Sequence, residues 1–412
     1  MTLAQTALPG RCAEHLATLI DVEPPLAYVD LDAFELNAGA MLAEAGTMPI
    51  RVATKSIRCT ALIRHATELD PRFLGAMAFT VREALNLARE GISDVLIGYP
   101  SVDRAGFTEL AAWLRDHPDQ VVRPMVDCEE HLELIGAAAT AAGTELRVCV
   151  DVDTAWRPLG DRGPSIGPKR SSLRTPEQVT ELIRFAAGVE GVRVDGLMAY
   201  DGQIAGVGDD LPERKFRARA IRFMQRRSLA ELMDRVPRVI EAARAEIEAG
   251  GGTLELVNVG GTGSLSKVRD LPGATELAAG SGFYAPTLFD TYRHLYLTPA
   301  AFFVLPVVRM PSDEVATVLG GGYIASGATG ADRSPRPVYP EGLAFDPDEG
   351  AGEVQTPLVG EGTVVLGIGS RVVFRHAKAG EFCERFDRLH IVRAEGLVDV
   401  VPTYRGEGHT FL

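Results

Sequence analysis

The sequence has little of what would mark several large classes of protein. Its five cysteines form no Cys-x-x-Cys pair, and 412 residues can build a core without a disulfide framework, so we expect reduced thiols. Lysine and arginine number 42 against 56 acidic residues, a net charge of −14, which leaves no basic surface to neutralise nucleic acid. No apolar run reaches membrane-spanning length, and the first residues carry no apolar signal core. We therefore expect a globular, cytoplasmic protein that binds neither nucleic acid nor membrane.

What is present is a regular alternation of apolar runs and helical segments between residues 50 and 280. Strand-length runs rich in valine, leucine and isoleucine are "IRVAT", "RFLGAMAF", "DVLIGYP", "VVRPMVD", "ELRVCVDVD", "VRVDGLMAY" and "LELVNVG", with "TELAAG" as a weaker eighth. One intervening helix opens on a capping box formed by Thr80 and Glu83. Strands apolar on both faces that alternate with helices predict an α/β fold, a (β/α)8 barrel. A doubly wound open sheet is the alternative, but no Gly-x-Gly-x-x-Gly follows an early strand.

The pattern changes toward the C-terminus. Runs such as "AFFVLPVVRM" and "GTVVLGIGSRVVFRH" read as strands joined by glycine- and proline-rich turns, with almost no helical periodicity. The early stretch "PLAYVDLDAFELNAGAML" is one strand and one helix too many for the barrel. We therefore predict an N-terminal strand and helix over 1–45, a barrel over 46–293 and an all-β domain over 294–412 that also takes in the N-terminal strand.

A lysine and two glycine-rich loops stand at strand ends of the predicted barrel. Lys55 ends the first strand, "NVGGTGS" follows the seventh and "AAGSG" the eighth. Barrels of this kind bind phosphate at the loops after strands seven and eight, and glycines let backbone N–H groups approach an anion. Each feature alone could have a purely structural role, because a glycine-rich segment often forms a simple turn and a surface lysine can cap a strand. Together they predict pyridoxal 5'-phosphate (PLP) bound to Lys55 as a Schiff base.

These motifs carry a family resemblance. In the order "AYVDLDAFELN", "RVATKS", "DVDTAWRPLG", "GLMAYDGQ", "GGTGS", "ELAAGSG", "VLGGGYIASG" and "VFRHAKAGEFCERF", the chain resembles fold-type III PLP enzymes, which have an alanine racemase-type barrel and a C-terminal β domain. Within that group it is most similar to the D-threonine aldolase and D-serine dehydratase branch. The resemblance covers nearly the whole chain and implies a homodimer that binds a small amino-acid substrate.

The resemblance assigns cofactor contacts residue by residue. It implies that Lys55 holds PLP, that Tyr200 meets the ring, and that the phosphate contacts are Gly261, Thr262, Gly280 and Ser281. Tyr200 could instead be a strand-end tyrosine that packs on the core. Arg157 stands for the family's arginine but follows Thr154 by three residues rather than four, so contacts in the loop 157–175 should differ. Asp151 and Asp153 are as consistent with capping or solvent-facing positions as with function.

The resemblance also implies a metal, and here the sequence departs from the pattern. The resembled branch holds a divalent ion, zinc or manganese, with a His-x-Cys or His-x-Asp pair in the β domain, whereas this chain has His376 followed by Lys378. A lysine ammonium has no lone pair to offer a metal. We therefore favour a metal-free site in which His376 and Lys378 act as acid/base or hydrogen-bonding groups. The competing view recruits Cys383 as the second ligand.

The reaction remains open among three alternatives. The first expectation is a lyase that cleaves a D-configured β-hydroxy amino acid by a retro-aldol reaction, and the second is a dehydratase that eliminates the β-hydroxyl. Tyr323, in "GGGYIASG", stands near where racemases of this fold place a catalytic tyrosine, so racemisation is a third. A PLP-binding protein without turnover is the non-enzymatic alternative; small barrel proteins of that kind lack the β domain expected here.

Overall fold

The computed structural model describes residues 8–160, 163–328, 330–378 and 380–412. Two compact units make up the chain. The barrel unit comprises Met41–Thr54, Ile63–Gly280 and Phe411–Leu412, and the β unit comprises Met1–Ala40, Lys55–Leu62 and Ser281–Thr410. The chain thus passes from the barrel unit to the β unit between Thr54 and Lys55, and again between Gly280 and Ser281. The domain limits expected after residues 45 and 293 stay predictions.

The barrel unit contains a parallel sheet that is nearly closed on itself. Its strands pair in the order β5-β4-β3-β2-β10-β9-β8-β7-β6. Pro124 separates β5 from β6, and its carbonyl still accepts from the amide of Cys149 in β7, so the two short strands act as one. The strands are β2 (Ile50–Ala53), β3 (Phe73–Ala78), β4 (Asp94–Ile97), β5 (Val121–Arg123), β6 (Met125–Val126), β7 (Leu146–Asp151), β8 (Val192–Ala199), β9 (Leu256–Val259) and β10 (Glu276–Ala279).

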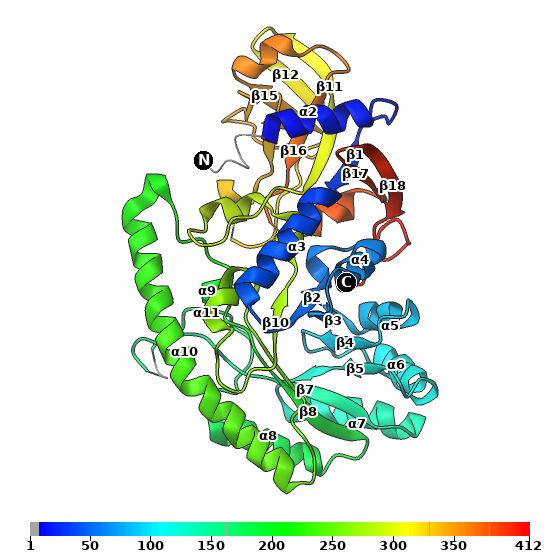
Figure 1. The fold of residues 1–412 in the computed structure, drawn as a ribbon, viewed down its shortest axis with the longest axis vertical. Helices are drawn as coiled ribbons and strands as arrows, with labels where there is room; N and C mark the ends of the chain where they lie inside the picture. The colour runs from blue at the N-terminus through cyan, green and yellow to red at the C-terminus, as the bar shows by residue number, and fades with distance from the viewer. Residues whose placement is uncertain (1–7, 161–162, 329, 379) are drawn as a thin grey trace. The chain divides into compact units, whose positions relative to one another are not determined.

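Helices follow the strands along the chain, and Figure 1 shows α5 to α8 on the outer side of the sheet. Thr80 caps α5 by accepting from the amide of Glu83 at 3.2 Å, which is one half of the predicted capping box, while the Glu83 carboxylate accepts from the amide of Phe79 at 2.6 Å. Thr175 caps α8 with Gln178 in a full capping box. The helices are α4 (Thr60–Glu68), α5 (Val81–Arg89), α6 (Arg104–Asp116), α7 (Glu129–Ala142), α8 (Pro176–Ala187), α9 (Gly202–Ala205), α10 (Lys215–Ala249) and α11 (Leu265–Val268).

The β unit is a mixed sheet in which the N-terminal strand is central. Strand β1 pairs antiparallel with β11 and parallel with β17, so the predicted barrel and all-β domain with its N-terminal strand are confirmed. The strands are β1 (Leu26–Asp30), β11 (Ala301–Ser312), β12 (Val315–Leu319), β13 (Arg336–Tyr339), β14 (Ala344–Phe345), β15 (Gln355–Val359), β16 (Arg371–Arg375), β17 (Arg388–Arg393) and β18 (Gly396–Pro402). The helices are α2 (Leu8–Thr18), α3 (Leu31–Ala45, which continues into the barrel unit) and α12 (Ser281–Tyr284).

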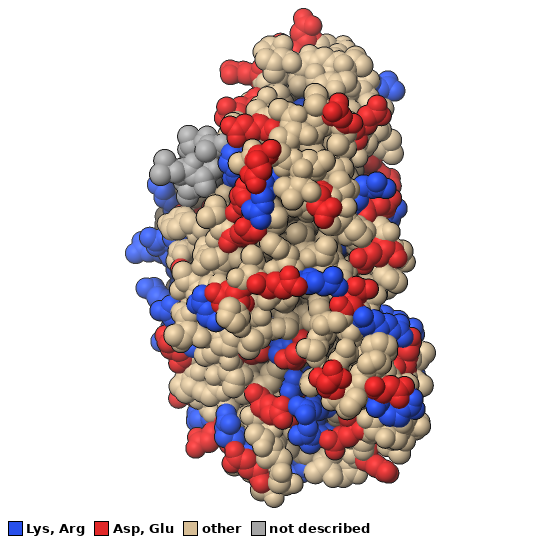
Figure 2. All heavy atoms as spheres, turned by 45° about the vertical axis from the view of Figure 1, so that its right-hand side comes forward, with Lys and Arg blue, Asp and Glu red and all other residues tan. Residues whose placement is uncertain are grey.

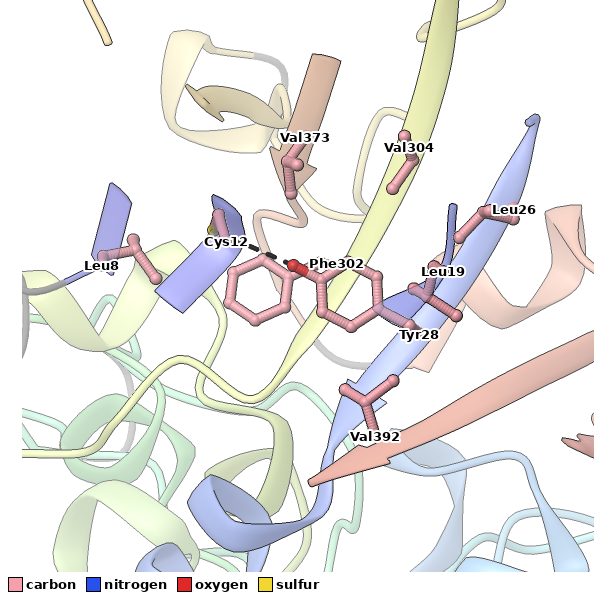
Figure 3. Packing of buried hydrophobic residues seen from close by; sticks show 9 residues of the cluster. All are labelled: Leu8, Cys12, Leu19, Leu26, Tyr28, Phe302, Val304, Val373 and Val392. Atoms are coloured by element: carbon pink, nitrogen blue, oxygen red, sulfur yellow. Dashed lines mark hydrogen bonds between the residues drawn. The ribbon is translucent and has the colours of Figure 1, made fainter. Parts of the chain in front are cut away.

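The core of the β unit forms where α2 covers this sheet. Figure 3 shows the rings of Tyr28 and Phe302 packed together between valine side chains, with the Tyr28 hydroxyl directed at Cys12. The ring centroids are 5.1 Å apart in a stacked arrangement. Burying such aromatic pairs adds about 0.5–1.5 kcal/mol beyond the area they remove from water. This packing fixes α2 to the sheet.

Charged side chains of both signs share the surface. On the face shown in Figure 2, lysines and arginines are interspersed with aspartates and glutamates. Surface pairs of opposite charge include Arg82 with Asp103 and Arg89 with Glu109. Within the described ranges no helix is both long and apolar enough to cross a membrane.

Candidate active site

The lysine segment is the first part of the candidate site, and it belongs to the β unit. Lys55 lies in a short 3-10 turn, Thr54–Ser56, and is half-buried. Its carbonyl accepts from the Arg58 side chain at 3.1 Å, and Arg58 forms an ion pair with Glu384. Gly380 lies so close that an added Cβ would meet the Ser56 carbonyl carbon at 2.8 Å and the Lys55 oxygen at 3.0 Å. Residues from the C-terminal part of the chain therefore fix the backbone that carries Lys55.

Tyr284 links this segment to His376. Its hydroxyl donates to the carbonyl of Ile57 at 2.9 Å, and its ring meets the His376 ring edge-on with centroids 6.1 Å apart. Both side chains are buried, and Phe382 packs against each of them. The segment after Lys55 and the first residue after β16 thus share one aromatic neighbour inside the β unit.

His376 is a neutral imidazole with a defined tautomer. Its Nδ1 lies 3.3 Å from the carbonyl of Ala301, which places the proton on Nδ1, and Nε2 has no hydrogen-bond partner among the described residues. Burial, together with the charge of Arg375, lowers the pKa of His376 to about 3. Its Nε2 therefore offers a lone pair, suited to accepting a hydrogen bond or to ligating a metal.

The side chains expected to complete a metal site do not offer a second ligand. Lys378 is half-buried and its Nζ donates to the carbonyl of Ser326 at 3.4 Å. Cys383 is buried and donates to the Ile57 carbonyl at 3.4 Å, and burial raises its pKa well above the ordinary range, so the thiolate is disfavoured. In the described part of the chain, no cluster of three metal-ligating side chains includes His376. These donors do not fit a metal centre at His376.

One such cluster does occur elsewhere, directly after β6. The ligand atoms of Asp127, Cys128 and His131 lie within 4.8 Å of one another. His131 Nδ1 is 3.1 Å from Asp127 Oδ1, an (i, i+4) pair that spans the first turn of α7. That local contact accounts for the arrangement without a metal.

Tyr323, the candidate racemase residue, packs within the β unit. Its ring centroid is 4.9 Å from that of Phe303 and 5.8 Å from that of Phe386, and the Arg385 guanidinium lies over the ring at 5.6 Å. Burial raises the pKa of Tyr323, which keeps its hydroxyl protonated.

The glycine loops form the second part of the candidate site, in the barrel unit. Gly260 has φ +76°, a left-handed conformation that favours glycine, and the chain then turns through Thr262–Ser264. Gly280, after β10, donates its amide to the hydroxyl of Thr262 at 3.3 Å, so the two loops are joined. Strands β9, β10 and β2 are hydrogen-bonded neighbours. Three adjacent strands therefore lead, at their carboxyl ends, into the two glycine loops and the lysine segment.

Close packing also requires glycine at positions 261 and 280. A Cβ on Gly280 would lie 2.2 Å from the carbonyl oxygen of Ala53 in β2. A Cβ on Gly261 would meet Ala205 at 2.9 Å and the Tyr200 ring at 3.0 Å, and the Gly261 amide already donates to Ser264 Oγ at 3.1 Å. Gly280 thus allows two strands to close the sheet, whereas Gly261 makes room for a tyrosine ring.

Tyr200 lies at the end of β8 and has neighbours on both sides. It is half-buried and packs against an inner cluster formed by Leu96, Met125, Cys149, Met198 and Leu256, as the packing alternative predicted. The guanidinium of Arg170 lies 4.9 Å from the Tyr200 ring and 5.1 Å from that of Tyr99, which follows β4. The sequence reading missed both Arg170 and Tyr99. Tyr99 and Tyr200 share a detectable signal, an aromatic residue just past a barrel strand, but nothing in "GPKRSS" marks Arg170.

Arg157 and the two aspartates have definite surroundings. Arg157 donates to Asp153 at 2.9 Å, and Arg174 approaches the same carboxylate at 3.4 Å. The possibility that Asp151 and Asp153 face solvent was wrong, because both are buried. Burial raises the pKa of Asp151 to about 7, against the opposing charge of Arg170. Residues 161 and 162 of the predicted contact loop lie outside the described residues.

Comparison with known proteins supplies the family. The family described as alanine racemase, N-terminal domain, matches residues 29–259, more than half of the chain. D-threonine aldolase from Filomicrobium marinum is 23% identical with a TM-score of 0.75, and the match covers 95% of this chain and 98% of that one. D-threo-3-hydroxyaspartate dehydratase from Delftia sp. HT23 is 18% identical with a TM-score of 0.68, covering 93% and 98%.

Alanine racemase from Clostridium difficile 630 is 14% identical with a TM-score of 0.59, covering 93% of this chain and 99% of that one. No curated protein matches the chain in a sequence search. At these identities the solved structures establish the fold, and the family match establishes the kinship. The chain belongs to the alanine racemase N-terminal domain family.

Proposed function

We propose that this protein is a PLP-dependent lyase that cleaves D-configured β-hydroxy amino acids between Cα and Cβ. The observation that carries the proposal is the strand order: β2, β10 and β9 are neighbours, and they lead into Lys55, Gly280 and the 260–264 loop. A similar structure named D-threonine aldolase supports the reaction class. A cytoplasmic homodimer is part of the proposal.

The residues present fit PLP. Lys55 would hold the cofactor through Nζ, the hydroxyls of Thr262 and Ser281 would bind its phosphate beside the turns that Gly261 and Gly280 shape, and Tyr200 would border its ring. Bound PLP supplies an electron sink for the bond that breaks at Cα. Everything else must come from side chains that position the substrate and move its β-hydroxyl proton.

His376 is suited to the β-hydroxyl. Its Nε2 lone pair can accept a hydrogen bond from that hydroxyl. Because the pKa of His376 is about 3, the protonated imidazole is a strong acid that would readily return the proton. Lys378, as a cation, would hydrogen-bond the β-oxygen, and as a neutral amine it would act as the base. In this assignment His376 and Lys378 handle the β-hydroxyl directly, without a metal. That agrees with the surroundings of His376, where neither Lys378 nor Cys383 offers a second metal ligand.

A second candidate is β-elimination from an acidic substrate, and Arg170 favours it. Arg157 and Arg174 are committed to Asp153, whereas Arg170 lies over two tyrosine rings and its charge opposes the rise in the pKa of Asp151. A guanidinium placed over aromatic rings can still donate its N–H groups to a carboxylate. A similar structure is named D-threo-3-hydroxyaspartate dehydratase. A substrate with a carboxylate on its side chain would use such a group.

The deciding experiment combines substrate scope with cofactor mapping. The purified protein should be yellow, and borohydride reduction followed by peptide mapping should label Lys55. Incubation with D-threonine, D-serine and D-threo-3-hydroxyaspartate, with assays for glycine, keto acid and ammonia, distinguishes cleavage from elimination. Glycine from D-threonine supports the aldolase. Keto acid and ammonia from the acidic substrate alone, lost in Arg170→Met, would favour the dehydratase, and a label on another lysine would overturn the site.

A further inference from the structure

We propose that Asp201 is a positioning residue that orders the 260–264 glycine loop and couples the binding of a phosphate group there to its own proton. The inference rests on the proposed function, because it names what lies behind the loop assigned to the cofactor phosphate. No part of the sequence reading pointed to this residue.

Asp201 occupies a helix N-cap position but does not cap the helix. Asp201 directly follows Tyr200 and stands at the N-cap of α9, where an aspartate normally accepts from a helix amide. Its side chain makes no cap hydrogen bond. It is fully buried instead, and its Oδ1 accepts from the hydroxyl of Ser264 at 3.0 Å. The carboxyl group is therefore committed to the glycine loop rather than to its own helix.

Ser264 passes this order on to the loop. A serine hydroxyl has one proton, and donating it to Asp201 leaves the Ser264 oxygen to accept from the Gly261 amide at 3.1 Å. The alternative acceptor, the Gly261 carbonyl, is farther away at 3.3 Å. Asp201 thereby selects the hydroxyl orientation that fixes the Gly261 amide, and with it the turn that leads to Thr262.

The second oxygen of Asp201 shows why charge matters here. Oδ2 is buried and has no hydrogen-bond partner in the described ranges. An ionised carboxylate with an unsatisfied buried oxygen is costly, so protonation at Oδ2 relieves it. Burial indeed raises the pKa of Asp201 to about 7, while Ser264 and Lys267 of α11 oppose the rise. Lys267 also faces Asp209 and Glu44, so its charge is shared among several acids.

A phosphate bound at the loop would shift the protonation equilibrium of Asp201. A dianion near a carboxylate raises the pKa of the carboxyl group further, so binding should favour the protonated Asp201. By linkage, phosphate affinity then falls as pH rises above about 7, and binding takes up a proton. Asparagine imitates the neutral form, because its Oδ1 can still accept from Ser264 while its amide occupies the place of the protonated oxygen.

The test compares Asp201→Asn with the wild type in full-length protein freed of cofactor. PLP affinity is measured by absorbance and fluorescence titration from pH 6.5 to 8.5, and inorganic phosphate is titrated as a second probe. Between pH 7 and 8.5 the wild type should lose about tenfold more affinity than Asp201→Asn for both probes. Asp209→Asn, which removes the other buried acid facing Lys267, is the matched control and should follow the wild type.

The outcomes separate this inference from the proposed function. A ratio of affinities that stays constant with pH overturns the coupling, as does an effect seen with PLP but absent with phosphate. Phosphate coupling without PLP binding would support the inference and refute the function, and no binding of either probe would refute both. If Asp201→Asn does not fold, calorimetry of the wild type in two buffers of different ionisation enthalpy decides it: proton uptake at pH 7.5 supports the coupling, and none overturns it.

Discussion

The two ends of the barrel treat buried charge in opposite ways. Near the amino ends of the strands, Arg51 of β2 is bound to Glu276 of β10 at 2.6 Å and to Asp94 of β4 at 3.0 Å. Farther along the strands, Arg123 of β5 binds Asp195 in the middle of β8 at 3.0 Å. At the carboxyl ends, Asp151 and Asp201 are buried with pKa values raised to about 7. The amino end pairs its buried charges, whereas the carboxyl end keeps, besides the paired Asp153, two carboxyl groups that can exchange a proton near neutral pH.

The difference indicates which end serves stability and which serves chemistry. Paired charges in a low-dielectric interior hold neighbouring strands in register, but they are expensive to break. Carboxyl groups without such partners reduce stability at neutral pH, and they are what proton transfer requires. In barrels of this kind the carboxyl-end face carries the active site. The charge pattern identifies that face without reference to any ligand.

The largest expected effect comes from breaking the amino-end pairs. Arg51→Met leaves the buried Glu276 carboxylate without its compensating charge and should lower the free energy of unfolding by roughly 3–5 kcal/mol. Denaturant unfolding measures the loss. Arg82→Met, which breaks an exposed pair with Asp103, is the control and should cost less than about 1 kcal/mol. PLP affinity of the folded Arg51 variant should be unchanged; a loss of affinity would mean that the two ends are not separable.

The second prediction reverses the sign at the carboxyl end. Burial raises the pKa of Asp151 in the folded protein to about 7, whereas in the unfolded chain the group ionises near pH 4. The free energy of unfolding therefore falls as pH rises from about 4 to about 7. Asp151→Asn should therefore be more stable than the wild type by about 2–4 kcal/mol at pH 8 and nearly equal to it at pH 4. Unfolding midpoints at pH 4, 6 and 8 measure this.

The neighbouring aspartate supplies the control for that experiment. Asp153 accepts from Arg157 and Arg174, so Asp153→Asn should destabilise the protein at pH 8. If Asp151→Asn gives the same increment at every pH, its carboxyl group does not titrate in this window. Asp201 would then be the one remaining example, of the two named above, of a carboxyl group that titrates near neutral pH at the carboxyl ends of the strands.

Sequence reasoning recovered the repeating elements but not these contrasts. The barrel strands are apolar on both faces, so their period and order could be read directly, and Lys55 and the glycine loops stood at fixed offsets from them. The burial of Asp151 and the place of Arg170 depend on how the 157–175 loop folds back, which local pattern does not encode. The role of Asp201 depends on Ser264, which is distant in sequence. Even Gly280, expected to admit a phosphate, turns out to lie against the Ala53 carbonyl.

That glycine leads to a third, smaller prediction. Gly280→Ala places a methyl group 2.2 Å from a strand carbonyl that cannot yield without shifting β2, and overpacking of this kind costs about 1–3 kcal/mol. Gly261→Ala meets a methyl group and a tyrosine ring, which can yield by small movements. We expect thermal unfolding to show the larger loss at Gly280, and PLP titration to show the larger relative loss at Gly261. Equal losses in both assays would remove the distinction between the two loops.

The smallest expected effect concerns His376, where the comparison extends to the β unit. Like Asp201 in the barrel unit, His376 is buried with one unsatisfied atom, but burial lowers its pKa to about 3, so it carries no charge between pH 5 and 8. A metal could exploit the Nε2 lone pair, yet Lys378 offers no second ligand and Cys383 is held as a thiol. We therefore expect His376→Ala to lower activity without changing metal content, which elemental analysis of protein purified without chelator or metal affinity resin should find substoichiometric in both forms. Near-stoichiometric zinc or manganese, lost together with activity in the variant, would show that His376 ligates a metal and would restore Cys383, deprotonated to solvent, as the candidate second ligand.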